Sequence, residues 1–264
     1  MLLERVLEAA APALRGHRIR AARAGARIVG VVLDDGRFGA GYHLPGERAR
    51  GLLDDAAPAG LRTCADPGAG LEAVPGQPAL EVARRCLLGE SAFRRALGVA
   101  ICNAAADPDP ARCLVDPDAA AAVPARPTDT VGFVGYVGSV VRRVQAEAAR
   151  TIIFDRSQED GEDVYPESLQ PELLPRCDLV FITGSALINR TLERLLTYCT
   201  RAREVVLIGP STPLYPEAFL GSGVTVLAGF RWQVADPDAA LEQVAAGAHF
   251  KHLKGRTSVT LRVE

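Results

Sequence analysis

Apolar and polar positions alternate in blocks along the second half of this chain. Short apolar runs end in glycine or small polar residues, and stretches with helical spacing follow them. This repeated order of strand, loop and helix predicts a parallel sheet joined by right-handed crossovers. The expected strands cover residues 130–134, 151–154, 178–182, 204–208 and 224–227, and the expected helices cover residues 139–149, 187–199 and 236–246.

The first half mixes helix signals with short strand signals. Residues 27–33 are the clearest strand, a polar turn follows at 34–37, and residues 38–43 can return as a hairpin partner. A meander followed by helices is an α+β arrangement. The expected helices cover residues 2–15, 79–88 and 91–105.

Two stretches rich in aspartate, proline or alanine separate the halves, at residues 107–110 and 116–129. They predict an α/β protein with a smaller N-terminal α+β domain over residues 1–120 and a C-terminal Rossmann-like parallel-sheet domain over residues 121–264. A chain of 264 residues, 48% of them hydrophobic, can bury a sizeable core.

Composition narrows the classes of partner. The net charge of −2 gives no electrostatic reason to expect nucleic acid or an anionic membrane. The N-terminal spacing indicates an amphipathic helix rather than a signal peptide, and no apolar stretch is long enough to span a bilayer. We therefore expect a cytoplasmic protein that binds a small molecule. An α/β protein of this size often forms dimers, so a homodimer is a further expectation.

The cysteines and histidines give little support for a soft-metal site. None of the six cysteines stands in a Cys-x-x-Cys pair, so we expect buried or partly buried free thiols. His249 and His252 could share a metal, with a solvated basic patch as the alternative, while His17 and His43 are isolated along the sequence. The chain contains no Gly-x-Ser-x-Gly elbow and no P-loop.

A glycine-rich turn follows the first expected strand of the second half. Gly132, Gly135 and Gly138 are spaced three residues apart, and Asp155 closes the next strand. Dinucleotide sites use such glycines to bring the backbone close to a phosphate, and such an acid to bind ribose. The spacing differs from the usual pattern, and bulky Tyr136 stands where phosphate would approach. The alternative is that these glycines serve only tight turns.

Two further loops place small polar residues after expected strands. Residues 183–191 supply hydroxyls, an amide and a helix N-terminus, which attract anions, whereas helix capping by Ser185 is the alternative. Residues 209–213 contain two prolines and form a rigid loop. Asp155 and Arg156 could pair with each other or bind a ribose or an anion. Because the carboxyl ends of parallel strands meet at one edge, we expect one ligand site there.

The order of these motifs resembles that of one family, named "putative heavy-metal chelation" domain. The resemblance covers about residues 128–250 and is carried by Val-Gly-Phe-Val-Gly-Tyr at 131–136, Cys-Asp-Leu-Val-Phe-Ile-Thr-Gly-Ser-Ala-Leu-Ile-Asn-Arg-Thr at 177–191, Leu-Ile-Gly-Pro-Ser-Thr-Pro at 207–213 and Leu-Ala-Gly at 227–229. Residues 96–105 resemble part of the enolase N-terminal domain, a domain usually fused ahead of this family.

The resemblance implies an enolase-N-like domain, a Rossmann-like domain and a cleft between them that binds or processes a metal or a metal-chelating small molecule. The loop analysis itself contributes Asp155, Arg156 and Ser185 as ligand-binding candidates. The candidates carried over from the family are Asn103, Gly132, Gly135, Tyr136, Thr183, Gly184, Asn189, Thr191, Gly209, Pro210, Ser211, Thr212 and Pro213.

Three functions stay open. The first is binding of a metal or chelator, with catalysis undecided. Oxygen donors such as Asp155, Thr183 and Ser211 suit a hard ion or a metal already held by an organic ligand. The second is a Rossmann-type enzyme with an adenosine-type cofactor, NAD(P) or S-adenosylmethionine, which rests on the glycine turn and Asp155. The third is a non-catalytic binding module, since the motifs show no obvious general base or nucleophile.

Overall fold

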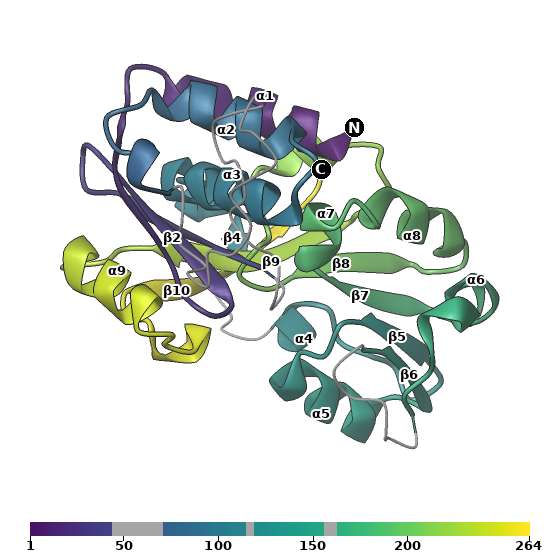
Figure 1. Cartoon of the computed structure of the whole chain (residues 1–264). Coiled ribbons are helices and arrows are strands. Elements are labelled where there is room, and N and C mark those ends of the chain that lie inside the picture. Colours follow the sequence, from purple (N-terminus) through teal and green to yellow (C-terminus); the bar gives the residue numbers. More distant parts are fainter. Residues whose placement is uncertain (44–70, 115–118, 156–162) are drawn as a thin grey trace, which may run out of the picture. The chain divides into compact units, whose positions relative to one another are not determined.

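The computed structural model describes residues 1–43, 71–114, 119–155 and 163–264. Contacts between residues divide the chain into two compact units. The first comprises Met1–Asp107 and Arg231–Thr257, and the second comprises Pro108–Phe230 and Ser258–Glu264. Each unit is built around a sheet, so the protein is an α/β protein of two parts (Figure 1).

In the described part of the first unit, three antiparallel strands form a sheet in the order β1-β2-β3. The predicted hairpin is confirmed, because Ile28 pairs with Tyr42 and Val32 pairs with Phe38 across the ladder. Every residue of β2 is buried, which agrees with its unbroken apolar run. The strands are β1 (Ile19–Ala24), β2 (Ile28–Leu33) and β3 (Phe38–Tyr42).

Helices cover both faces of this sheet, and two sets of glycines let them approach. On one face, α3 packs on β2 and β3, where Gly39 and Gly41 lack a β-carbon against the α3 backbone. On the other face, α9 packs on β1 and β2, and Leu241 and Val244 lie over Gly30. Helices α1 and α2 pack against α3. The helices are α1 (Leu2–Leu14), α2 (Ala79–Leu88), α3 (Ala92–Ala105) and α9 (Pro237–Ala245).

The second sheet has the strand order β4-β10-β9-β8-β7-β5-β6 among the described residues. The strands β6, β5, β7, β8 and β9 are parallel, as the sequence predicts, whereas β4 is antiparallel to β10. The sequence analysis predicted neither β4 nor β10. The strands are β4 (Cys113–Leu114), β5 (Thr130–Val134), β6 (Arg150–Phe154), β7 (Leu179–Thr183), β8 (Glu204–Ile208), β9 (Val226–Trp232) and β10 (Arg256–Arg262).

The core of the second unit lies between its parallel strands and the helices that join them. Phe133 of β5 and Phe181 of β7 stack with their ring centres 5.1 Å apart. Val140, Val141 and Val144 form the buried side of α5 in the same cluster. The helices of this unit are α4 (Ala119–Ala122), α5 (Gly138–Glu147), α6 (Gln170–Leu173), α7 (Ser185–Ile188) and α8 (Leu192–Tyr198).

The helix predicted over residues 187–199 is wrong as a single element, because the chain forms α7 and α8 with a break between them. Arg190 has a left-handed φ of 55° at the break. Both the amide and the hydroxyl of Thr191 donate to the carbonyl oxygen of Ala186, at 2.9 and 3.3 Å. A threonine side chain that bonds to a nearby carbonyl competes with regular helical bonding.

A membrane-spanning segment requires a long apolar helix. Across the described ranges, no helix has both the length and the apolar character needed to cross a bilayer.

Candidate functional site

The parallel part of the second sheet has a reversal in strand order between β5 and β7. From β5 the chain proceeds first to β6 on one side, then to β7 on the other side, and then outward to β8 and β9. Ligands of open α/β sheets bind at such a switch point, beyond the carboxyl ends of the strands. The loops that leave β5, β7 and β8 there are the three loops that the sequence analysis identified.

The loop after β5 requires glycine at residue 135. Gly135 has a φ of +91°, and its amide donates to the carbonyl oxygen of Phe154 at 2.8 Å. A β-carbon at this position would lie 2.7 Å from Cγ2 of Thr183. Both the backbone conformation and the contact with β7 therefore exclude a larger side chain.

Asp155 is bound to the same turn. Its Oδ2 atom accepts a hydrogen bond of 2.7 Å from the amide of Tyr136. This bond ties the end of β6 to the loop after β5 and gives the carboxylate a structural role. The amide of Tyr136 would compete with a ribose hydroxyl for this carboxylate oxygen, so the bond weakens the analogy with a dinucleotide site. Arg156, predicted beside Asp155, lies outside the described residues.

The other two glycines of the turn have different surroundings. Gly132 is in the middle of β5, where a β-carbon would lie 2.9 Å from Sγ of Cys177, so its role is core packing. Gly138 begins α5, and the nearest atoms to its missing β-carbon are Cε1 of Tyr136 at 3.1 Å and Nη1 of Arg142 at 3.4 Å. An aromatic ring and a guanidinium therefore lie beside the first turn of α5.

The loops after β7 and β8 pack against each other at Gly184. Its amide donates to the carbonyl oxygen of Ile208 at 2.8 Å. A β-carbon on Gly184 would lie 2.6 Å from the carbonyl carbon of Ser211 and 2.7 Å from the amide nitrogen of Thr212. Because these neighbours are backbone atoms, they cannot move aside as a flexible side chain would.

Thr183 lies at the centre of the three loops. It is the last residue of β7 and is half-buried. Its Oγ1 atom lies 3.7 Å from the β-carbon position of Gly135 and 4.0 Å from that of Gly209. Gly209 has a φ of +110°, and neither Gly135 nor Gly209 has a side chain that could cover this hydroxyl.

The loop of residues 209–213 buries polar groups. Ser211 and Thr212 are each 1% exposed. The amide of Thr212 donates to the carbonyl oxygen of Gly209 at 3.1 Å, which closes the turn that contains Pro210. The Oγ1 atom of Thr212 is buried and has no hydrogen-bond partner among the described residues. Buried hydroxyls are normally paired, so this one needs an explanation. Pro213 follows the turn.

The remaining candidates of the second unit follow Gly184. The prediction that Ser185 caps the helix is wrong, because Gly184 occupies the N-cap position and no side chain caps α7. Asn189 is half-buried, and its amide donates to the carbonyl oxygen of Ser185 at 2.9 Å. Thr191 uses its hydroxyl within the break described above, so its role there is structural.

Asn103 belongs to the first unit. It is 5% exposed in α3, and its Nδ2 atom donates to the carbonyl oxygen of Ala40 at 2.9 Å. This bond fastens α3 to β3. The structure therefore gives Asn103 a defined role inside its own unit, whereas its predicted role in ligand binding stays a prediction.

Thiols and imidazoles are not part of the three loops. The five described cysteines are free, as predicted, and Cys64 lies outside the described residues. Burial raises the pKa of Cys86, Cys102 and Cys177 to about 12, so these thiols stay protonated and are poor metal ligands. The loops supply hydroxyls, amides and one carboxylate, which suit an oxygen-rich ligand rather than a bare soft metal.

His17, which the sequence analysis considered isolated, has two acidic neighbours. Its Nδ1 atom lies 2.9 Å from Oδ1 of Asp34 and 3.5 Å from Oδ2 of Asp35. The hydrogen bonds from His17 and from the amide of Arg18 lower the pKa of Asp34. Arg37 pairs with Asp35 at 2.6 Å. Spacing in the sequence could not reveal this group, because the antiparallel pairing of β1 with β2, in which Ile19 lies opposite Leu33, brings residue 34 back to residue 17.

Comparisons with known proteins agree with the motif order. Two family models match the chain, DUF4213 over residues 7–106 and DUF364 over residues 118–263, and both are described as "Putative heavy-metal chelation". An uncharacterized protein from Methanocaldococcus jannaschii is 32% identical over 139 residues, which are 51% of this chain and 52% of that protein. The match thus spans about half the length of this relative.

Solved structures share the fold. A protein of unknown function from Pyrococcus horikoshii, assigned to the DUF364 family, superposes with a TM-score of 0.79 and 22% identity, and each chain is covered completely. A DUF364 protein of unknown function from Desulfitobacterium hafniense superposes with a TM-score of 0.72 and 22% identity over 98% of each chain.

Proposed function

Since this chain belongs to the family described as "Putative heavy-metal chelation", we propose that it binds an oxygen-rich organic chelator, with its metal, at the carboxyl edge of the second sheet. The proposal rests on the loops of the second unit, which surround the switch point between β5 and β7. The proposed function is therefore one of binding.

The observation that carries the proposal is the position of the Thr183 hydroxyl. It lies between two glycines of left-handed backbone conformation, on a half-buried residue at the switch point. Glycine at both neighbours leaves the backbone and the hydroxyl approachable, as a ligand-binding turn requires. Hydroxyl and amide groups donate hydrogen bonds to carboxylate or hydroxamate oxygens well. As neutral metal ligands, they hold a bare cation poorly.

The buried Thr212 hydroxyl supports the same site. An unpaired buried hydroxyl costs about 1–3 kcal/mol relative to a paired one. The loop that carries it packs directly on Gly184, one residue from Thr183. A ligand polar group that reaches this hydroxyl on binding, with a small shift of the loop, would recover that free energy.

Native mass spectrometry of gently purified protein, with elemental analysis of the same sample, tests the proposal. We expect an organic molecule and a metal to be retained together in wild type and largely lost in Thr183→Val. Thr197→Val is the matched control, because Thr197 is an exposed threonine of α8 whose hydroxyl bonds to its own helix. Retention of metal without an organic mass, or equal retention in both variants, would contradict the proposal.

A second candidate is an adenosine-type cofactor at the same switch point. The order β6-β5-β7-β8-β9 is the 2-1-3-4-5 order of flavodoxin-like sheets, which bind nucleotides at this position. An adenosine-containing mass without metal in the same spectrum would favour this candidate. Loss of that mass in Asp155→Asn, despite the bond from Asp155 to Tyr136, would assign the carboxylate a second role.

A further inference from the structure

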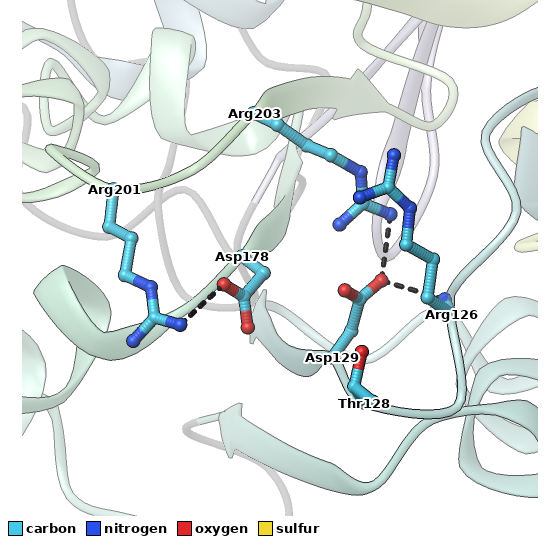
Figure 2. A pocket seen from close by; sticks show the side chains of 6 residues that line it. All are labelled: Arg126, Thr128, Asp129, Asp178, Arg201 and Arg203. Carbon is cyan, nitrogen blue, oxygen red and sulfur yellow. Dashed lines mark hydrogen bonds and ion pairs between the residues drawn. The ribbon is translucent and has the colours of Figure 1, made fainter.

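A charged recess lies at the opposite edge of the second sheet, where β5, β7 and β8 begin (Figure 2). Its volume is about 330 Å³. Asp129, Asp178 and Arg203 each directly precede one of these strands. Because the strands are parallel, their starting points share one edge. The recess is lined by Arg126, Thr128, Asp129, Asp178, Arg201 and Arg203.

Both aspartates of the recess are committed to bonds within the protein. Oδ2 of Asp129 lies 2.7 Å from Nη2 of Arg203 and accepts a hydrogen bond of 2.7 Å from the amide of Arg126. Oδ1 of Asp178 lies 2.9 Å from Nη2 of Arg201, and its Oδ2 accepts from the amide of Thr130 at 3.0 Å. The carboxylates thus fix the segments that lead into β5 and β7.

Asp129 keeps its negative charge in this setting. Burial opposes ionisation, but the hydrogen bonds from Arg203 and from the amide of Arg126, together with the positive charges of both arginines, outweigh it and hold the pKa of Asp129 below its ordinary value. The recess therefore contains two neutralised pairs, Arg203 with Asp129 and Arg201 with Asp178. Neither carboxylate is left over to bind a cation.

The third arginine has no such partner. The guanidinium of Arg126 makes no hydrogen bond or ion pair with any residue that the structure describes, although its own backbone amide binds Asp129. Figure 2 shows its side chain extending away from that amide, past the Asp129 carboxylate and toward the side of Arg203. With three arginines and two aspartates, the recess carries one uncompensated positive charge.

We propose that this recess binds a phosphate-class oxyanion, either free phosphate or a phosphomonoester, through the Arg126 guanidinium. Arg201 uses one nitrogen for Asp178 and is 63% exposed, so it can still present donors to the recess. Thr128 adds an exposed hydroxyl. Guanidinium groups bind phosphate oxygens through paired N–H donors, and several donors around one recess suit a tetrahedral anion.

The alternative is that the cluster only fastens the strand ends. That role needs Arg201 and Arg203, which pair with the aspartates, but it does not need the Arg126 guanidinium. The proposal is independent of the chelator site, because the two involve opposite ends of the same strands. Failure of one proposal therefore leaves the other unaffected.

Calorimetric titration of the full chain with inorganic phosphate at low ionic strength tests the proposal, since salt screens such contacts. We expect saturable binding of phosphate by wild type. Arg126→Gln should weaken it at least about tenfold, the usual loss for a charged hydrogen bond. Arg194→Gln is the matched control, because Arg194 is an exposed arginine of α8 outside the recess, and it should bind phosphate as wild type does.

Amide chemical shifts locate the bound anion. We expect phosphate to shift the amides of Thr128, Asp129 and Asp178 in wild type and not in Arg126→Gln. A parallel titration with glucose 6-phosphate distinguishes the two sources of the anion, since tighter binding of the ester indicates a phosphorylated metabolite. Absence of saturable phosphate binding, an unchanged affinity in Arg126→Gln, or shifts confined to residues 135–138 would each overturn the proposal.

Discussion

The two edges of the second sheet are built from the same strands but have opposite chemistry. At the carboxyl edge, glycines bring loops into backbone contact, the Thr183 hydroxyl lies near two of these glycines, and the Thr212 hydroxyl is buried without a partner among the described residues. At the amino edge, arginines and aspartates form ion pairs around an open recess. The first edge depends on close packing, and the second depends on charge. Substitutions should therefore affect the two edges in different ways.

The largest effect is expected at the carboxyl edge, from Gly184→Ala. The added β-carbon would lie 2.6 Å from backbone of Ser211, so the two loops would have to separate. We expect a loss of about 2–3 kcal/mol in the free energy of unfolding, measured by urea denaturation. Gly221→Ala is the control, since no atom lies within 4 Å of its β-carbon position, and strain from its φ of 69° should cost only about 1 kcal/mol. Equal losses would show that the loops do not pack as described.

The next effect is at the amino edge, from Asp129→Asn. The side chain of Asp129 is 5% exposed and that of Arg203 is 27% exposed, so loss of the anion leaves a largely buried cation unpaired. We expect a loss of about 2 kcal/mol at neutral pH. The control is Asp238→Asn, because its pair with Arg20 involves a carboxylate side chain that is 71% exposed and should contribute little.

The same variant has a pH signature. The pKa of Asp129 is lower in the folded protein than in the unfolded chain, so its stabilisation is complete above the unfolded value of about 4 and is lost as pH falls through the folded value. We expect the stability difference between wild type and Asp129→Asn to shrink during acid titration below about pH 4. A difference that stays constant with pH would show that the charge of Asp129 does not cause the stabilisation.

A smaller effect of opposite sign is expected from Thr212→Val at the carboxyl edge. The substitution removes a buried hydroxyl that has no partner and keeps the shape of the side chain. We expect the ligand-free protein to gain about 1 kcal/mol in stability, measured by urea denaturation, while retention of the chelator decreases. A loss of stability instead would show that the hydroxyl has a partner in solution.

The smallest effect on stability is expected from Arg126→Gln. Its exposed guanidinium forms no hydrogen bond or ion pair with the described residues and acts on Asp129 only through its charge, so the free energy of unfolding without phosphate should change by less than about 0.5 kcal/mol. Addition of phosphate should then stabilise wild type but not the variant, measured as a shift in Tm. A marked loss of stability without phosphate would show that the Arg126 guanidinium is needed for the fold itself.

The candidate site was only partly predictable from the sequence. Apolar runs that end in Gly-rich or hydroxyl-rich loops predicted the three loops, and their common edge followed from the parallel order of the strands. The sequence could not predict that Gly132 packs against Cys177 or that the Asp155 carboxylate binds the amide of Tyr136. Both depend on which atoms of neighbouring strands come into contact, which a spacing of residues does not specify.

The sequence by itself determined most of the strands, most of the helices and the division into two kinds of sheet, because hydrophobic periodicity is a local property of the chain. The likeness of the first unit to the N-terminal domain of enolase stays a prediction. Helix α9 is far in sequence from the β1-β2-β3 sheet, and only the tertiary structure decided that it covers the second face of that sheet. The tertiary structure also decided that Arg126, Arg201 and Arg203 surround one recess. Long-range contacts of this kind depend on the order of the strands in the sheet. Arginines that are far apart in the sequence show no pattern from which their common recess could be predicted.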